Sequence, residues 1–508
     1  MRTKRWSVCQ NCRAKKLACD GLQPACSQCA LRNKPCSGYK QNYVFMPGNA
    51  SNTRLKGKST QRKGITSARA ASAPSTSTSD ARGSCHNILS SAMHLITPDG
   101  LDTSNPSAFS HTLEDDIRFI VRQYVPISGD VSPKAMVSQA QNEICGAWVD
   151  VLPVVAMTRG SEQPLTSAIG TLALVLRYYV LKEHVRHSEI LDMYCRALEN
   201  LGKALADAQG IFHIEHCIAM MCLADADVAA PTLKSGWMMH VKAVGDMMER
   251  LGPTPFADDP MHTMFIGFRP LLLWSSMLNR RGAFLMRKEW TTRPFEGQPV
   301  SMMQRLLNLA CELPALLERF DETIDSLEHD LGKIEHLWGE FCALLLKVQE
   351  WEQNVTSETP QPLVWSKCDP NIWPSSNSSA LWFPNLMVAN SLTHCWGFEI
   401  VMRTHLSTLH QLIYKTRQYH PQIHKGMNAE AFEEASILIL AEKICDSTPY
   451  LLQTKFKFHG LWSAHFTLPT ALRVLRQKQE DDGSPNERCR RIESLLADRE
   501  IYFPDIQQ

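Results

Sequence analysis

Six cysteines near the start of the chain have a spacing suited to metal binding. They occupy positions 9, 12, 19, 26, 29 and 36, and the second three repeat the first three at an offset of 17 residues. Structural zinc prefers four thiolate ligands in a tetrahedral arrangement. Six thiolates complete two such sets only when two sulfurs bridge the metals. The pattern therefore predicts two zinc ions per chain, held by Cys9, Cys12, Cys19, Cys26, Cys29 and Cys36.

A disulfide framework is the alternative explanation for an even number of closely spaced cysteines. Such frameworks belong to small secreted domains, whereas Met1–Trp6 is charged and leads into no apolar segment or cleavage site of a signal peptide. The other eleven cysteines are scattered through apolar segments, as expected for buried thiols in a reducing compartment. These observations favour zinc over disulfides.

The distribution of charge indicates a polyanionic partner. Residues 1–70 contain fifteen Lys and Arg and a single acid, Asp20, although the whole chain has a formal net charge of only +1. The rest of the chain must therefore be acidic, at about −13. A basic end on an acidic body is typical of proteins that bind nucleic acid.

Two short helices are expected within the cysteine-rich segment, at residues 10–17 and 27–33. Neither could bury enough apolar surface to fold alone, so the metals would supply the folding energy. Lysine suits the reading of guanine, because its ammonium can donate to O6 and N7 in the major groove. The basic residues that we expect to contact nucleic acid are Arg5, Arg13, Lys15, Lys16, Arg32, Lys34 and Lys40.

On these residues the segment resembles the fungal binuclear zinc cluster (Zn2Cys6) transcription factors. The resemblance rests on the cysteine spacing, on the basic residues between the second and third cysteines, and on Pro24 in the loop that joins the halves. It implies that Cys9 and Cys26 bridge the two metals. One departure is Ala18, because family members often carry a basic residue there.

The same resemblance implies roles for the basic residues. The first helix would lie in the major groove of double-stranded DNA, a placement known for this module, and read a CGG-type triplet. Lys15 and Lys16 would contact base edges. The remaining contacts would go mainly to phosphates, from Arg13, Arg32, Lys34 and Lys40, while Arg5 belongs to a basic arm that precedes the cluster.

Three regions are expected along the chain: a zinc cluster domain at 1–46, a linker at 47–106 and a helical domain at 107–508. Residues 51–80 include twelve Ser and Thr and few large apolar residues, so they cannot offset the entropy of ordering, and we expect the basic linker to be disordered. Residues 37–60 lack an apolar heptad repeat, which argues against a coiled-coil dimer next to the cluster. Dimerisation through the helical domain stays open.

Helical periodicity dominates the third region. Thr112 and Asp115 form a capping-box-like start, and an apolar face from Leu113 to Tyr124 ends before Pro126. Strand alternation is nearly absent, so the fold class is a small zinc-nucleated module, a disordered linker and a large all-α domain. Further helices are expected near 134–157, 165–184, 187–208, 213–228, 235–251, 262–280, 301–352 (at least two), 383–418, 429–446, 457–478 and 486–499.

A second, looser resemblance lies in the helical domain. Its residues follow the order seen in the second type of fungal-specific transcription factor domain, which is regulatory. They are Trp237, His240, Gly245, Leu251–Pro253, Arg269, Arg280, Arg281, Phe284, Leu285 and Trp290.

Other groups with potential chemistry have simpler explanations. His240 shares a helix face with apolar residues and is interpreted as a core histidine. His213, His216, Cys217 and Cys222 could bind metal, but their apolar neighbours favour core packing. The methionine pairs 238–239 and 247–248 are typical of adaptable core or of the lining of an effector pocket. The chain contains no recognised catalytic motif, so we expect it not to be an enzyme.

The sequence thus predicts a nuclear, sequence-specific DNA-binding regulator of RNA polymerase II transcription with two zinc ions. By resemblance it would control a biosynthetic gene cluster or nutrient use. The expected partner is double-stranded DNA, with a homodimer, a small-molecule effector or a co-regulator also open, and no membrane. A zinc-cluster co-regulator that binds protein or RNA is the alternative.

Overall fold

The computed structural model describes residues 112–124, 148–159, 163–208, 211, 213–230, 236–326, 330–359, 361–368, 380–419, 434–483 and 486–498, together with Cys29 and Arg32. The chain divides into two units, residues 1–76 and 77–508. The predicted linker and most of the predicted zinc domain lie outside the described residues. No helix in the described part of the chain has the length and apolar character that crossing a membrane requires.

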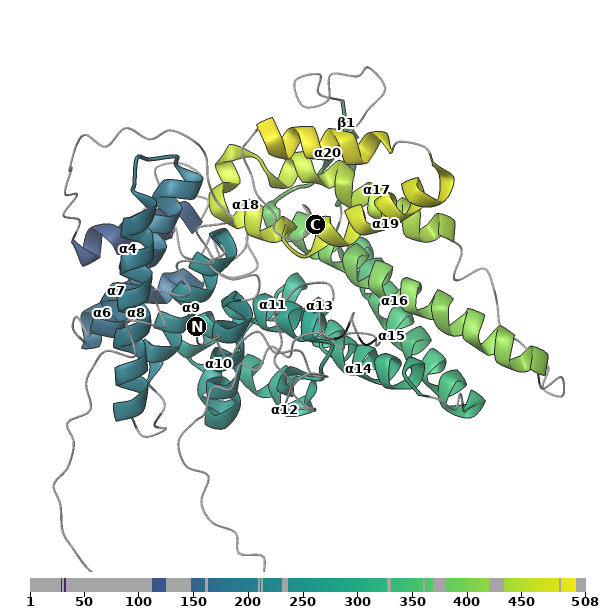
Figure 1. Ribbon diagram of the computed structural model, residues 1–508, viewed down its shortest axis with the longest axis horizontal. Coiled ribbons are helices and arrows are strands. Elements are labelled where there is room, and N and C mark those ends of the chain that lie inside the picture. Colours follow the sequence, from purple (N-terminus) through teal and green to yellow (C-terminus); the bar gives the residue numbers. More distant parts are fainter. Residues whose placement is uncertain are drawn as a thin grey trace, which may run out of the picture. The chain divides into compact units, whose positions relative to one another are not determined.

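The second unit is built mainly from helices (Figure 1). Its α-helices are α4 (Leu113–Tyr124), α6 (Leu152–Arg159), α7 (Gln163–Val175), α8 (His187–Asp207), α9 (Ile214–Ala229), α10 (Gly236–Leu251), α11 (Met261–Asn279), α12 (Lys288–Thr292), α13 (Met302–Ala310), α14 (Leu313–Ile324), α15 (Leu331–Glu358), α16 (Leu386–Tyr419), α17 (Glu434–Leu451), α18 (Lys457–Ala464), α19 (Thr467–Asp482) and α20 (Glu487–Asp498). Shorter turns are η1 (Trp148–Val151), η2 (Leu176–Val180), η3 (Thr254–Ala257), η4 (Phe284–Met286), η5 (Arg293–Phe295) and η7 (Thr454–Phe456).

Helix α9 is the centre of the first half of this unit. It packs against α7, α8 and α10, and every residue from Glu215 to Val228 is buried. A helix that is buried on all sides needs neighbours on all sides, because no face is left for solvent. The sequence Ile214–Ala229 suits this position, since most of its residues are small or apolar.

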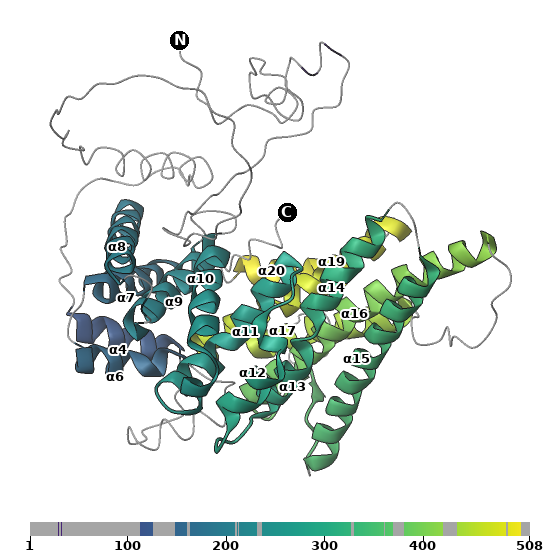
Figure 2. The same ribbon diagram turned by 90° about the horizontal axis from the view of Figure 1, so that it is seen from below.

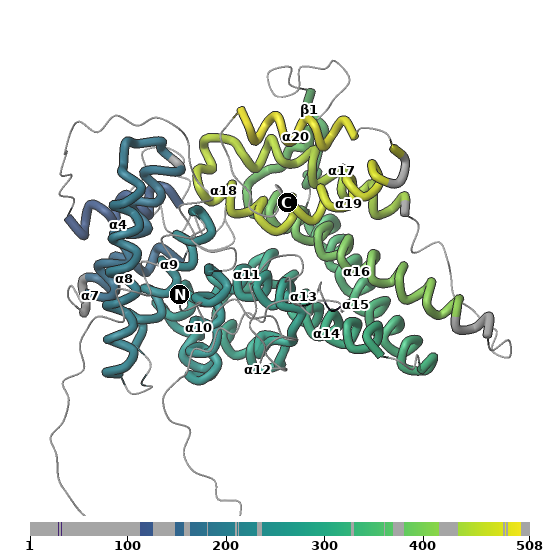
Figure 3. Tube along the Cα trace, viewed as in Figure 1, coloured from purple at the N-terminus to yellow at the C-terminus, as the bar shows by residue number. Residues whose placement is uncertain are grey.

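The second half of the unit is organised around α16. This helix packs against α15 on one side and α17 on another, and α19 also contacts it (Figures 1 and 2). The tube in Figure 3 shows α15 and α16 running side by side along much of their lengths. Helix α11 contacts both halves, through α10 and η1 on one side and α13 and α14 on the other.

The helical prediction is confirmed for the described residues, with one addition and several changed boundaries. The reciprocal capping box forms, because the Asp115 N–H donates to Thr112 Oγ1 at 3.2 Å and the Thr112 N–H donates to Asp115 Oδ2 at 3.3 Å. The segment predicted as at least two helices at 301–352 forms α13, α14 and part of α15. The segment predicted as one helix at 457–478 forms α18 and most of α19. The addition is a two-stranded antiparallel ladder, β1 (Trp365–Lys367) with β2 (Ala380–Trp382). Three residues per strand are too few for an alternating pattern to be recognised.

One face of helix α11 carries Gly267, which has no side chain, and Pro270, which has no backbone N–H. A Cβ at Gly267 would lie 3.0 Å from the Trp148 Cα, so the absence of a side chain lets η1 approach α11. Proline cannot donate to the Ile266 carbonyl four residues earlier. The Gln304 side-chain amide donates to that carbonyl instead, at 2.9 Å.

The fully buried Arg269 belongs to the same arrangement. Its guanidinium donates to Gln304 Oε1 at 3.0 Å and to Asn308 Oδ1 at 2.7 Å, and burial lowers its pKa to about 10. These bonds tie α11 to α13 and give both terminal nitrogens of the buried cation neutral acceptors.

We predict that Gly267→Ala destabilises the second unit. The added methyl group would press on the backbone of Trp148, and overpacking of this kind costs about 1–3 kcal/mol. The matched control is Gly339→Ala in α15, where a Cβ would meet nothing within 4 Å. This control should stabilise the protein by about 0.5–1 kcal/mol, the ordinary helix preference for alanine. Urea unfolding of both variants measures the difference, and equal effects would contradict the close packing at Gly267.

Candidate zinc and nucleic-acid sites

Two of the predicted site residues lie among the described residues. Cys29 has helical backbone and is buried, with 4% of its surface exposed, and the Arg32 N–H donates to its carbonyl oxygen at 3.3 Å. Arg32 is exposed. The burial of Cys29 agrees with its predicted role as a metal ligand, and the exposure of Arg32 agrees with its predicted role as a contact.

The remaining predicted ligands and contacts lie outside the described residues, so their roles stay predictions. The ligands are Cys9, Cys12, Cys19, Cys26 and Cys36, and the contacts are Arg5, Arg13, Lys15, Lys16, Lys34 and Lys40. The donor set fits zinc, because all six candidate ligands are thiols and borderline-soft zinc prefers thiolate sulfur. Cys29, the described member of the set, is buried, which suits a metal ligand.

His216, Cys217 and Cys222 of α9 form core packing, as the sequence indicates, and the half-buried His213 precedes the helix. His216, Cys217 and Cys222 are each at most 4% exposed, and burial raises the pKa of the Cys217 thiol to about 12. The rings of His213 and His216 lie 5.0 Å apart. A thiol with so high a pKa is protonated at neutral pH, which is unfavourable for metal binding.

His240 belongs to a buried hydrogen-bond network, which agrees with its interpretation as a core histidine. Tyr194 Oη donates to Asp227 Oδ2 at 2.7 Å and lies 2.9 Å from His240 Nε2. The Tyr194 proton is already used, so His240 Nε2 must be the donor in the second bond. Burial lowers the His240 pKa to about 4, which keeps the ring neutral. This network joins α8, α9 and α10.

A second network surrounds Asp225, two residues before Asp227 and therefore on the opposite side of α9. Asp225 Oδ2 accepts from the Tyr124 hydroxyl and, at 2.9 Å, from Trp148 Nε1. Trp462 Nε1 donates to the Tyr124 oxygen at 2.9 Å. Burial raises the pKa of Asp225 to about 7 and that of Tyr124 well above its ordinary value. The network joins α4, η1 and α18 to α9, and no sequence pattern indicated these pairings.

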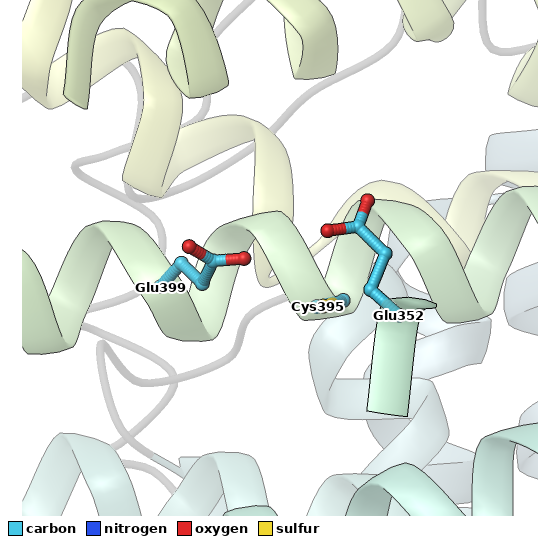
Figure 4. Close-up of side chains that lie close together, drawn as sticks. All are labelled: Glu352, Cys395 and Glu399. Atoms are coloured by element: carbon cyan, nitrogen blue, oxygen red, sulfur yellow. The ribbon is translucent and has the colours of Figure 1, made fainter. Parts of the chain in front are cut away.

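One cluster with metal-ligand chemistry occurs among the described residues, formed by Glu352 of α15 with Cys395 and Glu399 of α16 (Figure 4). Its ligand atoms lie within 4.8 Å of one another. The carboxylates already accept hydrogen bonds, from Trp396 Nε1 at 2.9 Å to Glu352 and from Arg403 at 2.9 Å to Glu399. Burial, followed by these two carboxylates, raises the Cys395 pKa well above its ordinary value. We therefore interpret the cluster as a buried ion-pair network and assign no metal to it.

Five histidines, three of them buried and two half-buried, are held neutral by desolvation. Burial is the main cause that lowers each pKa to about 4, compared with an ordinary value of 6.5. The residues are His240, His394, His405, His459 and His465.

Comparison with known proteins identifies the class of the N-terminal segment. Residues 7–43 match the family model of the fungal Zn(2)-Cys(6) binuclear cluster domain. The chain therefore carries a zinc cluster domain of this type, and the resemblance to the fungal zinc cluster transcription factors is confirmed. The domain implies zinc binding, and a pair of ions is inherent to it. The resemblance of residues 237–290 to a particular C-terminal domain stays a prediction.

A curated relative agrees with this class. The chain is 28% identical over 139 residues to the sorbicillinoid biosynthetic cluster transcription factor sor3 of Hypocrea jecorina (strain QM6a). The match spans 26% of this chain and 21% of the relative. No solved structure matches the chain.

We predict that the full-length chain binds two zinc ions and that Cys9→Ala disrupts both sites, because by resemblance Cys9 bridges the metals. Native mass spectrometry should find two zinc ions in the parent protein and none bound tightly in this variant. The matched control is Cys368→Ala, which removes an exposed cysteine of the second unit and should leave both ions bound. Retention of one ion by Cys9→Ala would contradict the bridging role.

The buried histidines predict that acid destabilises the second unit. Between pH 7 and 5 the unfolded chain takes up protons at these histidines, whereas the folded chain does not, so the free energy of unfolding falls. Raised carboxyl pKa values, about 6 for Asp150 and about 7 for Asp225, oppose this change, because the folded chain holds those protons and the unfolded chain does not. The histidines are more numerous, and each net proton contributes about 1.4 kcal/mol per pH unit.

Urea unfolding followed by tryptophan fluorescence measures this dependence, because eleven of the twelve tryptophans lie beyond residue 76. Asp225→Asn removes one opposing group and should make the loss of stability on acidification steeper. Stability that is unchanged or increased at pH 5 would contradict the neutral burial of the histidines.

Proposed function

We propose that this protein is a nuclear regulator of RNA polymerase II transcription that reads CGG-type sites in double-stranded DNA through its zinc cluster. The match of residues 7–43 to the binuclear cluster domain carries the proposal. The basic residues between the second and third cysteines support it, since they concentrate positive charge at the metal centre. The relative's printed name, a biosynthetic cluster transcription factor, supports control of a biosynthetic gene cluster as its role.

The zinc ions would hold the module together when bound. Cys9, Cys12, Cys19, Cys26, Cys29 and Cys36 would ligate them, and metal binding would supply folding energy that the short helices lack. The chain's own residues then perform the recognition, by presenting cations at fixed positions on the cluster surface.

The different roles proposed for the basic residues follow from the chemistry of DNA. Phosphate contacts supply affinity without sequence information, and base-edge contacts supply specificity. Lys16, with Lys15 assisting, would donate to guanine O6 and N7. Arg13, Arg32, Lys34 and Lys40 would bind phosphates, and the guanidinium of Arg32 is exposed as this role requires.

The helical unit is proposed to regulate and not to catalyse. In its core, Asp227 accepts a hydrogen bond from Tyr194 and His240 is kept neutral by burial, which suits packing more than proton transfer. Its acidic balance makes it a poor DNA ligand.

We predict that Lys16→Ala weakens binding to a CGG duplex by about 1–3 kcal/mol and has much less effect on a scrambled duplex, because the lost contact carries sequence information. Arg13→Ala should weaken binding to both duplexes alike and reduce the slope of log K against log salt by about one. Titrations of the full-length, zinc-loaded protein at several salt concentrations measure both effects.

The matched control is Lys333→Ala, which removes an exposed lysine from the helical unit and should change neither affinity nor slope. Equal losses on both duplexes for Lys16→Ala would make Lys16 a phosphate contact. If the parent protein shows no preference for any sequence, the module is instead a protein- or RNA-binding co-regulator.

A further inference from the structure

A cavity of about 90 Å³ lies in the core of the second unit, beside the Asp225 network. It is partly open to solvent. Three helices provide most of its wall: α11 through Gly267, Phe268, Pro270, Leu271 and Trp274; α16 through Asn390 and His394; and α18 with the residues that follow it through His459, Trp462, Ser463, His465 and Phe466. The spacing of these residues follows the helix repeat, so one face of each helix is turned to the same space.

The wall is mainly aromatic. Trp148, Phe268, Trp274, Trp462 and Phe466 all line the cavity, and Trp274 stacks on Trp237 behind it with ring centroids 4.5 Å apart. Aromatic walls favour planar rings, which can stack or meet them edge to face. The special backbone of α11 contributes directly, because neither Gly267 nor Pro270 places a long side chain in this space.

His394 supplies a defined hydrogen-bond acceptor. Its Nδ1 lies 2.8 Å from the Asn390 carbonyl oxygen, and because a carbonyl only accepts, Nδ1 carries the proton. Nε2 of the neutral ring is therefore an acceptor. Burial lowers the His394 pKa to about 4, so the ring stays neutral near pH 7. His394 is only 8% exposed and lines the cavity, so a ligand in the cavity would lie next to this ring.

The charge of the lining restricts the ligand further. No lysine or arginine is among the described residues that line the cavity. A carboxylate or phosphate would lose its hydration there without gaining a cation. The Asp225 oxygen that accepts from Tyr124 and Trp148 is already engaged, which disfavours a cationic ligand.

We propose that this cavity binds a small uncharged aromatic compound that carries hydroxyl or N–H groups, with one donor bonded to Nε2 of His394. An engineered cavity of about 150 Å³ holds benzene, so a space of about 90 Å³ with an open side accommodates one ring inserted in part. The ligand would contact α11, α16 and the α18 segment together, and its binding would stabilise their packing.

The four methionines at 238–239 and 247–248 were expected to be core residues or the lining of an effector pocket. They do not line this cavity. Met248 is fully buried and Met239 is exposed.

The site is independent of DNA recognition, so its test is separate from that of the proposed function. Resorcinol is the probe, and three rings of similar size act as comparisons: toluene, which lacks a donor; benzoate, which is an anion; and benzylammonium, which is a cation. Calorimetric titration and thermal unfolding of the full-length, zinc-loaded protein measure binding. Resorcinol should bind and raise the unfolding midpoint, and each comparison should bind at least tenfold more weakly, because a buried acceptor discriminates against ligands that leave it unpaired.

Two variants locate the site. Leu271→Trp places a large side chain at the partly exposed rim of the cavity and should reduce resorcinol affinity at least tenfold. Its matched control is Leu278→Trp on the same helix, where the leucine is 44% exposed and outside the lining, and affinity should not change. His394→Phe removes the acceptor and should abolish the preference for resorcinol over toluene.

Several results would overturn the proposal. These are no binding of resorcinol to the parent protein, affinity for benzoate, benzylammonium or toluene that equals that for resorcinol, or full affinity in a folded Leu271→Trp variant. The ranking of the four compounds on the parent protein decides the ligand class even where a variant fails to fold.

Discussion

The burial of α9 on every side is the constraint on which the helical unit depends. Asp225 and Asp227 are almost completely buried and point to opposite sides of this helix. A buried carboxyl group is costly without hydrogen-bond donors. Each aspartate therefore requires a tyrosine hydroxyl, from Tyr124 on one side and Tyr194 on the other, and these requirements set where α4 and α8 pack.

The same constraint shapes the cavity. Trp148 must approach Asp225 closely to donate to it, and it can do so because Gly267 of α11 offers no side chain in its path. Pro270, one turn further along, leaves a backbone carbonyl that Gln304 satisfies from α13. Helix α11 thus departs from regular helix packing and hydrogen bonding at Gly267 and Pro270. These two residues lie next to the Asp225 network and also line the aromatic cavity.

The parts of this structure that sequence could predict are those that depend on local spacing. The capping box at Thr112, the helical repeat of α8 and α10, and the cysteine pattern of the zinc domain are all readable from neighbours in the chain. The break between α18 and α19 could not be predicted from the sequence, because the apolar pattern continues through both helices. The pairing of Tyr124 with Asp225 spans 101 residues, and nothing in either local sequence specifies the other. The place of His394 in the cavity wall could not be predicted either, because it depends on residues of α11 and α18 that are distant in the sequence.

The binding proposed for the N-terminal segment and the binding proposed for the helical unit depend on different electrostatics. The N-terminal segment concentrates uncompensated positive charge, so its attraction to a polyanion is long-ranged and weakens with salt. The lining of the cavity described above contains neutral imidazoles, aromatic rings and an engaged carboxyl group, so its selectivity comes from desolvation and hydrogen-bond geometry, which salt screens very little. Because the two proposed kinds of binding respond to different variables, a ligand in the helical unit would alter stability and packing there without changing the intrinsic chemistry of the proposed DNA contacts.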